Sequence, residues 1–385
     1  MHVAIFSPGF PPSSTGGEEY YAYYQAKELQ QMGNAVYVVA NGDNNKNCDK
    51  SSFEAINLQL VKPTRLKTSF MRYAFVAVKF TFSFLRLKIR PNVIHAHDPY
   101  GEGLAAVLVG KILNVPIVVT WHAAELMEKK AHFSFLGNIC RLVVLRSADR
   151  IIVNSNLFKK LAFNAVGYSG LSSKTRIVSP GVDVNEFSLK NNVQDLRCSL
   201  AGENDFIVLS VCRLEKIKGL DILLRSIPQV LESIPNVKFV IVGSGTELQF
   251  LTELSEKLHI ASHTYFAGSI SRSLLPQYYS ACDVFVIPTR GEGFGMAYLE
   301  AWSCRKPIIT TPYAPEIAKL VSTYGGGIIV GDDSRQLSSE IVRLLSNNKL
   351  RTEMGLIGRK IAESEYSWKK TVSDNLQVYK ELCLN

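Results

Sequence analysis

Apolar strand-like runs alternate with helical stretches along this 385-residue chain, and that alternation constrains the fold more than any other feature. Strands separated by helices pair in parallel, which predicts the α/β class with helices on both faces of each sheet. In the first half, helices at 18–32, 70–88 and 101–113 separate strands at 3–7, 35–40, 91–97, 115–121 and 150–154. In the second half, helices at 219–232, 246–258, 273–280 and 295–303 separate strands at 206–212, 237–242, 264–267, 283–287, 307–310 and 328–330.

The length of the chain predicts two such domains. A chain of 385 residues is too long for one ordinary domain and fits two of nearly equal size. Hydrophobic residues make up 46% of it and charged residues 20%, which indicates a well-buried globular protein. We place the boundary between residues 185 and 186, within a linker at about 179–195.

Seven cysteines, at 48, 140, 198, 212, 282, 304 and 383, show neither paired nor metal-ligand spacing. We expect them to be free thiols in a reducing compartment. The chain enters its first strand without a basic, apolar leader, and its apolar runs are interrupted by charges such as Lys79 and Lys111. These features predict a cytoplasmic location.

The excess of positive over negative charge lies entirely in the first half of the chain. Residues 1–190 hold 22 Lys and Arg against 13 Asp and Glu, whereas residues 191–385 hold 21 of each. No acidic residue occurs between Glu54 and Asp98, where eight basic residues do: Lys62, Arg65, Lys67, Arg72, Lys79, Arg86, Lys88 and Arg90.

This basic segment is interleaved with aromatic and aliphatic residues, which permits two interpretations. An amphipathic basic helix can bind an anionic membrane surface, with Arg72, Lys79, Arg86 and Lys88 on the lipid side. Alternatively, Phe75, Val78, Phe82 and Leu85 form the buried face of a domain helix. Nucleic acid is a poorer partner, because no recognised binding module accompanies the charge.

The segment Arg290-Gly-Glu-Gly-Phe-Gly-Met-Ala-Tyr-Leu-Glu300 places Glu292 and Glu300 eight positions apart. Upstream, a buried strand ends near Arg213, and Lys218 follows five residues later. Glycines let a backbone approach a ligand closely, and a helix start offers free N–H groups to an anion or hydroxyl. Arginine and lysine supply the charge that a leaving diphosphate needs, so these features together predict a site for a nucleotide-diphosphate sugar.

Two glutamates also raise the possibility of a glycoside hydrolase. Its carboxyl groups flank one bond, about 5–5.5 Å apart in retaining enzymes and about 6.5–9.5 Å in inverting ones. A largely helical segment between Glu292 and Glu300 separates them by roughly 12 Å. The two carboxylates therefore suit two parts of one long ligand better than one scissile bond.

Three motifs carry a resemblance to the retaining glycosyltransferases of family 4. They are the Glu-x7-Glu stretch, Arg213-Leu-x3-Lys218-Gly219, and Pro180-Gly-Val-Asp183. The resemblance implies two facing Rossmann-like domains of the B-type glycosyltransferase architecture (GT-B), with the active site in the interdomain cleft. It also implies that the last helix, at 367–385, crosses back onto the acceptor-binding domain 1–185, while 186–366 binds the nucleotide sugar.

The resemblance assigns Glu300 to the ribose hydroxyls and Glu292 to the donor sugar. Arg213 and Lys218 stabilise the diphosphate, with backbone contacts from Gly16, Gly17, Phe294, Gly295 and Met296. Gly243 is expected to border the nucleotide, and Gly268 and Ile270 to hold the base through the backbone. One departure is Thr311-Pro-Tyr-Ala-Pro-Glu316, which replaces the common Gly-Gly-x-Pro-Glu turn while keeping Glu316.

Three histidines follow or lie on predicted strands of the first half. His122 ends strand 115–121, where it can bond a sugar hydroxyl or stabilise positive charge on the ring; the alternative is a structural role. His95 and His97 point the same way, which suggests a metal, but no third ligand is evident and the family's transfer needs none. We expect a supporting role for His95 and an acceptor-side contact for His97.

The sequence thus predicts a metal-independent retaining transferase without a resident cofactor. It would move a hexose-type sugar from a UDP- or GDP-linked donor to a hydroxyl acceptor by front-face displacement, with His122, Arg213, Lys218 and Glu292 as the catalytic set. The basic first half favours a lipid-linked or envelope polysaccharide precursor at the inner face of the cell membrane. A soluble sugar-phosphate acceptor and a nucleotide-sugar epimerase of the same fold are the alternatives.

Overall fold

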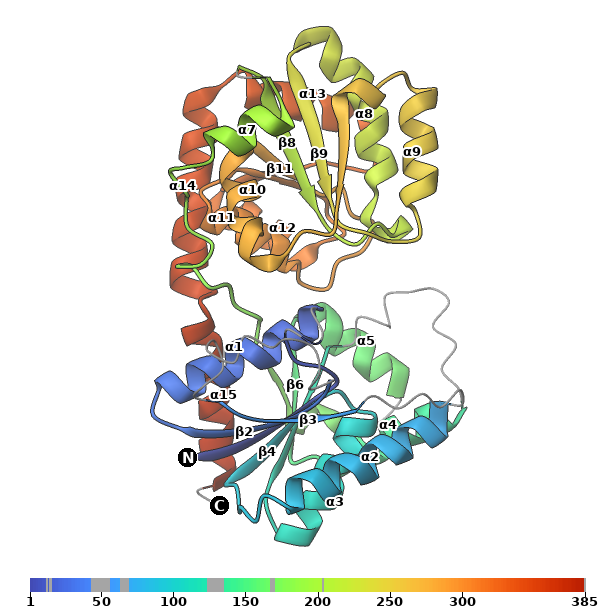
Figure 1. Cartoon of the computed structure of the whole chain (residues 1–385), viewed down its shortest axis with the longest axis vertical. Coiled ribbons are helices and arrows are strands. Elements are labelled where there is room, and N and C mark those ends of the chain that lie inside the picture. The colour runs from blue at the N-terminus through green and yellow to red at the C-terminus, as the bar shows by residue number, and fades with distance from the viewer. Residues whose placement is uncertain are drawn as a thin grey trace. The chain divides into compact units, whose positions relative to one another are not determined.

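The computed structural model describes residues 1–11, 13, 16–42, 56–62, 69–122, 135–166, 170–202 and 204–383. The chain forms two compact units: Met1–Pro180 with Trp368–Asn385, and Gly181–Ser367 (Figure 1). The division after Pro180 lies five residues before the boundary expected from the sequence. Cys48, Arg65 and Lys67 fall outside the described residues.

The first unit is built on a seven-stranded parallel sheet in the order β3-β2-β1-β4-β5-β6-β7. Its strands are β1 His2–Ser7, β2 Ala35–Asn41, β3 Asn57–Val61, β4 Val93–His97, β5 Ile117–Trp121, β6 Arg150–Val153 and β7 Thr175–Ile177. Successive side chains of a strand point to opposite faces. Accordingly, Ala4 and Phe6 of β1 enter one core cluster, and Val3 and Ile5 enter another.

Helices cover both faces of this sheet. They are α1 Gly17–Gln31, α2 Ser69–Leu85, α3 Gly101–Leu113, α4 Phe135–Ser147, α5 Asn156–Val166, α6 Leu171–Lys174 and α15 Trp368–Cys383. Helices α2 to α5 share the core of Phe6, whereas α1 and α15 share that of Ile5. The last helix of the chain therefore belongs to the first unit, where both ends of the chain lie (Figure 1).

The second unit contains a six-stranded parallel sheet in the order β10-β9-β8-β11-β12-β13. Its strands are β8 Phe206–Val211, β9 Val237–Val242, β10 Thr264–Gly268, β11 Val284–Val286, β12 Ile308–Thr310 and β13 Gly327–Ile329. Counted from its own first strand, this order is 3-2-1-4-5-6, the doubly wound Rossmann order, and the first six strands of the other unit follow it too. The predicted fold class is confirmed by the two parallel α/β sheets.

The helices of the second unit are again divided between the two faces of the sheet. They are α7 Gln194–Leu200, α8 Leu220–Ser233, α9 Leu248–Lys257, α10 Leu275–Ala281, α11 Met296–Ser303, α12 Pro315–Tyr324, α13 Ser334–Leu345 and α14 Asn348–Glu365. Helices α8, α9 and α13 pack on the face that holds Val208, and α10, α11, α12 and α14 on the face that holds Leu209.

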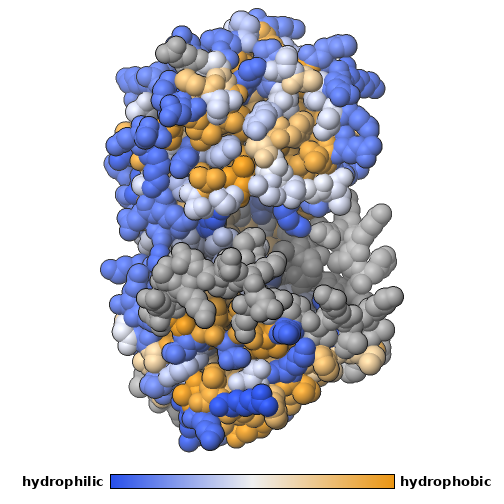
Figure 2. Space-filling model, in the orientation of Figure 1, coloured by the Kyte–Doolittle hydropathy of each residue, from blue (hydrophilic) through white to orange (hydrophobic). Residues whose placement is uncertain are grey.

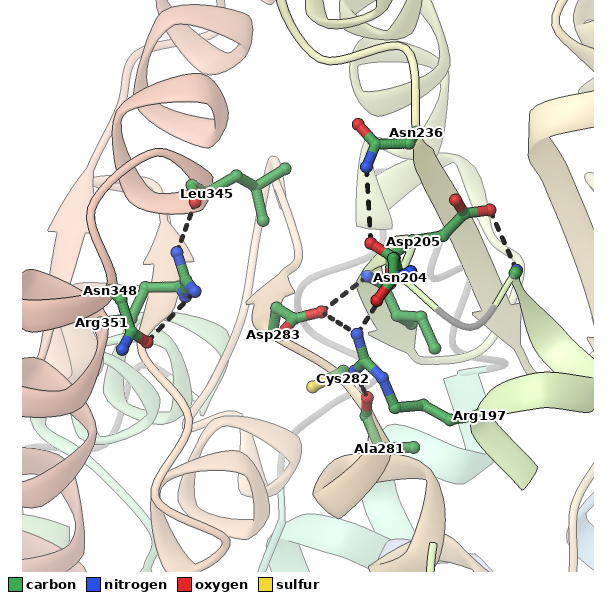
Figure 3. A network of polar contacts seen from close by, with 12 residues as sticks. Arg197, Asn204, Asp205, Asn236, Ala281, Cys282, Asp283, Leu345, Asn348 and Arg351 are labelled. Atoms are coloured by element: carbon green, nitrogen blue, oxygen red, sulfur yellow. Dashed lines mark hydrogen bonds and ion pairs between the residues drawn. The ribbon is translucent and has the colours of Figure 1, made fainter. Parts of the chain in front are cut away.

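A polar network fastens the amino ends of β8 and β11 (Figure 3). The guanidinium of Arg197, on α7, pairs with Asp283 at 3.1 Å and donates to the carbonyls of Ala281 and Asp205. The same Asp283 carboxylate accepts the N–H of Ile207 at 2.8 Å. These contacts fix the sheet at its amino edge, which is opposite to the edge where parallel α/β sheets bind ligands.

Candidate active site

The strand order reverses between β1 and β4 in the first unit and between β8 and β11 in the second. Doubly wound sheets bind ligands beyond the carboxyl ends of their strands at this reversal. In the second unit Arg213 and Lys218 follow β8, Gly243 follows β9, and Glu292 follows β11. The structure therefore gathers the predicted donor residues of the second unit at the carboxyl edge of one sheet.

The loop after β8 carries the two predicted cations. The Arg213 side chain is exposed, and no ion pair of the described residues includes it. Lys218 ends a short 3-10 helix, Lys216–Lys218, and Gly219 then begins α8 with φ +68°. A Cβ at residue 219 would lie 2.0 Å from the carbonyl oxygen of Pro288, so only glycine allows this loop to pack against the end of β11.

Backbone hydrogen bonds join the loop after β11 to the loop after β8. The carbonyl of Ile217 accepts from the N–H of Arg290 at 2.7 Å and from the hydroxyl of Thr289 at 3.0 Å. This attachment brings the carboxylate of Glu292 to 2.5 Å from the ammonium of Lys218. The two side chains are only 16% and 13% exposed, so the pair is held in a largely desolvated position.

A second ion pair supports the same loops, and sequence reasoning did not find it. Arg290 forms a two-point contact with Asp221, at 2.6 and 2.9 Å. Burial acts to raise the pKa of Asp221, but the hydrogen bonds and charge of Arg290 outweigh it and lower that pKa. Arg290 thereby helps to hold the two loops together.

Gly295 starts α11 in the left-handed region, with φ +86°. A Cβ there would approach the ring of Tyr298 to 2.6 Å, so glycine is required. The first amides of a helix have no partner within it, which is why the N–H groups of Gly295 and Met296 remain candidates for a ligand. The neighbouring Phe294 is buried, with its ring 5.4 Å from that of Tyr366.

Glu300 lies on the buried side of α11 and has two side-chain partners. Arg272 donates to one carboxylate oxygen at 3.0 Å, and the Tyr279 hydroxyl donates to the other at 2.8 Å. Burial raises the pKa of Glu300, while Arg272 and Tyr279 act in the opposite direction. Glu292 and Glu300 thus have separate partners within the protein. Arg272 was missed because it lies 28 residues away in sequence.

Two of the three glycines at this edge serve the packing of the loops. A Cβ at Gly243, where φ is +137°, would lie 1.9 Å from the carbonyl oxygen of Cys212, and one at Gly245 would lie 2.3 Å from that of Leu214. Gly268 ends β10 with φ +67° and open space around it, two residues before Ile270, which packs against the core. Contacts of these residues with a nucleotide stay a prediction.

The segment that departs from the common glycine turn is attached to the Glu292 loop. The Tyr313 carbonyl accepts the N–H of Glu292 at 2.9 Å, and the Thr311 hydroxyl donates to the Thr289 carbonyl at 2.5 Å. The side chain of Tyr313 is about half exposed, and Glu316 lies in the first turn of α12. The turn forms without glycines because Thr311 and Ala314 close it through their own hydrogen bond at 3.1 Å.

In the first unit, Gly16 and Gly17 begin α1. Gly16 is the N-cap residue, in extended conformation, and no side chain caps the helix start. A Cβ at Gly16 would meet the Glu19 carboxylate at 2.2 Å, so that side chain lies over the first turn. The glycines are placed where an anion could approach, next to two acidic residues of the helix, Glu18 and Glu19.

The three histidines form one buried stack across β4 and the end of β5. Ring centroids lie 4.7 Å apart for His95 and His97 and 5.6 Å apart for His97 and His122. His97 is 0% exposed and lies against the Gln25 amide and His122, so its predicted acceptor contact could only be indirect. His122 retains 7% exposure and is the outermost of the three.

Neutral side chains continue this stack in both directions. Asn154 lies 3.1 Å from Nδ1 of His122, and Gln25 Oε1 lies 2.5 Å from Nε2 of His97. At the inner end, Nδ1 of His95 contacts the Tyr379 hydroxyl at 2.5 Å, and its Nε2 contacts Thr120 at 2.6 Å. Burial lowers the pKa of His122 to about 4 and that of His95 to about 3, so the cluster is uncharged at neutral pH.

Within the described residues, no group of three or more His, Cys, Asp or Glu is arranged to hold a metal ion. The six described cysteines are free, as predicted. Cys212, beside Arg213, is partly buried, and burial raises the pKa of its thiol to about 12.

The predicted membrane-side cations lie on α2 or directly after it. Lys79 lies over the ring of Phe75 at 4.7 Å, and Arg86 over that of Phe82 at 4.6 Å. Helix α2 ends at Leu85, three residues before the predicted end, so Arg86 and Lys88 belong to the following turn. In the alternative buried face, Phe75, Val78 and Phe82 are wrong, because all three are exposed and the core takes Val76, Phe80 and Phe84. The fourth residue, Leu85, is partly buried and packs against that core, as this alternative expected.

Comparison with known proteins agrees with this geometry. The family described as Glycosyltransferase Family 4 matches residues 15–186, and Glycosyl transferases group 1 matches residues 194–361. The structure of Anabaena HepE in complex with UDP and glucose superposes with a TM-score of 0.79 at 19% identity, covering 98% of this chain and 99% of that one. At that identity the likeness shows a shared fold.

Two relatives match over shorter stretches. D-inositol 3-phosphate glycosyltransferase of Thermobifida fusca is 30% identical over 244 residues, 61% of this chain and 55% of that protein. A GDP-mannose-dependent phosphatidylinositol monomannoside mannosyltransferase of Mycolicibacterium smegmatis is 28% identical over 208 residues, 52% of this chain and 54% of that protein. The alignments thus span about half the length of these two relatives. Taken with the two family matches, they show that the chain belongs to the family 4, group 1 glycosyltransferases of the B-type fold.

Proposed function

We propose that this glycosyltransferase moves a hexose-type sugar from a nucleotide-diphosphate sugar to a hydroxyl acceptor and retains the anomeric configuration. The observation that carries the proposal is the Lys218–Glu292 pair beside the exposed Arg213, at the strand-order reversal of the second sheet. Guanidinium and ammonium groups bind phosphate oxygens strongly, and partial burial strengthens the attraction.

The donor would occupy the carboxyl edge of the second sheet. Each carboxylate oxygen of Glu300 has two lone pairs, and Arg272 and Tyr279 use one each, which leaves acceptors for ribose hydroxyls. Anabaena HepE was crystallised with UDP and glucose, and the mycobacterial relative is named as GDP-mannose-dependent. These names support a uridine or guanosine diphosphate sugar for this chain.

Transfer would require Lys218 to change partners. Its ammonium would turn from Glu292 to the diphosphate, and Glu292 would then accept a hydroxyl of the donor sugar. The bond between the anomeric carbon and the phosphate oxygen breaks as the acceptor oxygen bonds the same face of that carbon, and the departing phosphate oxygen takes the acceptor proton. This front-face displacement needs no nucleophilic side chain and no metal ion. From the first unit, Gly16, Gly17 and His122 are the groups we assign to the reaction.

We further propose a lipid-linked acceptor, such as a glycolipid or envelope polysaccharide precursor, reached from an anionic membrane surface on the cytoplasmic side. The net charge of +9 and the basic residues of α2 support it. Helices long and apolar enough to span a bilayer do not occur in the described part of the chain. A soluble sugar phosphate is the second candidate, because the Thermobifida relative is named for inositol 3-phosphate.

The test is acceptor-dependent turnover. Purified protein is incubated with UDP- or GDP-sugars and with either a lipid extract or inositol phosphate, and release of nucleoside diphosphate is followed. We expect release with the lipid extract and an α-linked product from an α-linked donor, read from the anomeric coupling by NMR. An inverted product would contradict retention, and turnover with the soluble acceptor alone would favour the second candidate.

A further inference from the structure

Helix α2 exposes one apolar side while it buries another. Met71, Phe75, Val78 and Phe82 follow each other at spacings of four, three and four, which places them on one side of the helix. They are 46–61% exposed. The opposite side, with Val76, Phe80 and Phe84, is buried in the core. The exposed side is therefore not needed for folding.

Helices α3 and α4, which contact α2 and each other, extend this apolar surface. Leu108 and Ile112 of α3 and Leu136, Ile139 and Val143 of α4 are exposed as well. With Leu87, this region holds ten of the nineteen exposed large hydrophobic side chains of the described residues. Figure 2 has the orientation of Figure 1, and hydrophobic and hydrophilic residues lie side by side over the part of the surface where α2 and α3 lie. We call it the three-helix surface.

The exposed charges on the described residues of these three helices are of one sign. Helices α2 and α4 contain no acidic residue, and the one in α3, Glu102, is buried. Arg72, Lys79, Arg86, Lys88 and Lys111 lie on or beside the three helices. A second copy of the chain would meet this surface with the same positive charge, which disfavours self-association. An apolar surface with a basic rim matches an anionic lipid bilayer.

We propose that the three-helix surface docks the protein on an anionic membrane, with apolar residues of all three helices inserted among the headgroups. This proposal extends the membrane contact from α2 to α3 and α4. It depends on the proposed function in one respect, namely that the acceptor is a lipid. Binding to lipid is separable from sugar transfer, because the donor residues lie in the second unit.

The test is sedimentation of the protein with phosphatidylcholine vesicles, with and without phosphatidylglycerol. We expect binding only with the anionic lipid. The double variant Phe75→Ser, Phe82→Ser should reduce binding to the anionic vesicles at least tenfold, and so should the double variant Ile112→Ser, Val143→Ser. Each charge removed by Lys79→Gln or Arg86→Gln should weaken it about fivefold. The matched control is Leu248→Ser with Phe250→Ser, exposed on α9, which should bind normally.

Three results would overturn this proposal. One is unchanged binding in the Ile112→Ser, Val143→Ser variant, which would remove α3 and α4 from the contact. Another is equal binding to neutral vesicles. The third is a wild-type dimer in solution that the α2 variant converts to a monomer, which would make a second copy the occupant. A shift in melting temperature by a nucleotide sugar, retained in these variants, shows that the donor site is intact whatever the vesicle result.

The buried histidine stack carries a second inference, independent of the first. Because Gln25 Oε1 can only accept, Nε2 of His97 must donate to it, and its Nδ1 is then an acceptor. His122 faces that acceptor with Nε2 at 3.4 Å and faces the Asn154 amide nitrogen with Nδ1 at 3.1 Å. Both contacts select the neutral His122 tautomer with hydrogen on Nε2.

We propose that Gln25, His97 and Asn154 are positioning residues that hold His122 in this tautomer. The 3.4 Å separation from His97 is long for a hydrogen bond, so His97 engages the Nε2–H of His122 only weakly. Tyr379 connects Gln25 and His95 to α15, so the last helix of the chain belongs to the same support. His122 then acts as a neutral hydrogen-bond donor.

Nitrogen-15 NMR of histidine-labelled protein tests this directly, because the two ring tautomers have distinct shifts. We expect hydrogen on Nε2 of His122 in the wild type and on Nδ1 in Asn154→Asp, since a carboxylate can only accept. Turnover of that variant should fall with little change in the KM for the donor. A wild-type His122 with hydrogen on Nδ1 would overturn the proposal, and that spectrum does not depend on the folding of any variant. Asn154→Ser, which can still donate, should keep the wild-type tautomer.

Discussion

The carboxyl edges of the two sheets share one topology but differ in whether their buried polar groups are charged. In the second unit the edge holds charged partners: Lys218 with Glu292, Arg290 with Asp221, and Arg272 with Glu300. In the first unit the corresponding edge holds three buried, neutral histidines joined by amides and hydroxyls. The residues that follow the strands, rather than the fold, decide what each edge can bind. A charged edge suits a diphosphate, and a neutral donor suits hydroxyl groups.

Burial explains why the two edges differ in charge. An ion taken out of water is tolerated where an opposite charge accompanies it, as Glu292 accompanies Lys218. Among the described residues, no carboxylate is a hydrogen-bond partner of these histidines, and burial favours their neutral form and lowers their pKa values. Substitutions at the two edges should therefore differ in the kind and the size of their effects.

The largest effect should follow from Lys218→Ala. Loss of one preorganised charge from a leaving diphosphate typically lowers turnover by about 10²–10³-fold, or about 2.7–4 kcal/mol. Steady-state kinetics with saturating donor measures it. The matched control is Lys257→Ala at the carboxyl end of α9, away from the site, which should leave turnover unchanged. Equal activity in both variants would remove Lys218 from the reaction.

Gly243→Ala should destabilise the second unit by about 3 kcal/mol or more, because its Cβ would meet the Cys212 carbonyl and its φ of +137° strains any side chain. Gly268→Ala is the matched control: with φ +67° and open space, it should cost only about 1–2 kcal/mol. Urea unfolding without ligand compares the two. Equal costs would contradict the packing role assigned to Gly243.

Lowering the pH should destabilise the neutral edge. His122 has a pKa of about 4 in the folded chain against 6.5 unfolded, so the unfolded state binds its proton first as the pH falls. The buried, neutral His122 stabilises the fold fully above pH 6.5. This stabilisation is lost as the pH falls toward 4, and about 2 kcal/mol of it is already lost at about pH 5. Urea unfolding at neutral and acidic pH should show that the free energy of unfolding depends less on pH in His122→Gln than in the wild type. The exposed His259→Gln should behave as the wild type.

The smallest effect concerns the thiols. Burial raises the pKa values of Cys212, Cys282 and Cys304 to about 12, so almost no thiolate exists near neutral pH. Iodoacetamide should modify the exposed Cys198 first, as mass spectrometry of the native protein would show. Rapid labelling of Cys212 would mean that the loop beside Arg213 opens in solution.

The buried strands were predictable because each is a short apolar run ended by a turn residue. Strand β9, between Asn236 and Gly243, was predicted at its observed bounds. Strands β3 and β7 were missed because they are short edge strands with polar residues. The exposed side of α2 was not predictable, because the helix is apolar on two sides and periodicity does not say which one the sheet covers.

The site was predictable where its residues follow one another in the chain. Arg213 with Lys218, and Glu292 with Glu300, lie in two short segments whose glycines mark close packing. Partners supplied by tertiary structure were not predictable: Gln25 and Tyr379 are 354 positions apart, and Arg290 and Asp221 are 69 apart. His97 illustrates the same limit, because its burial depends on α1 and on its stacking between His95 and His122.

Nucleotide-sugar binding at the charged edge is the central claim, and a thermal-shift comparison tests it most directly. Wild type, Arg213→Ala and Lys257→Ala are each melted with UDP-, GDP- and ADP-sugars. A ligand at 100 times its dissociation constant stabilises the folded state by about 2.7 kcal/mol, a readily measured shift. We predict a shift with one nucleotide in the wild type and in Lys257→Ala, and none in Arg213→Ala. An equal shift in all three proteins, or no shift with any nucleotide, would contradict the claim.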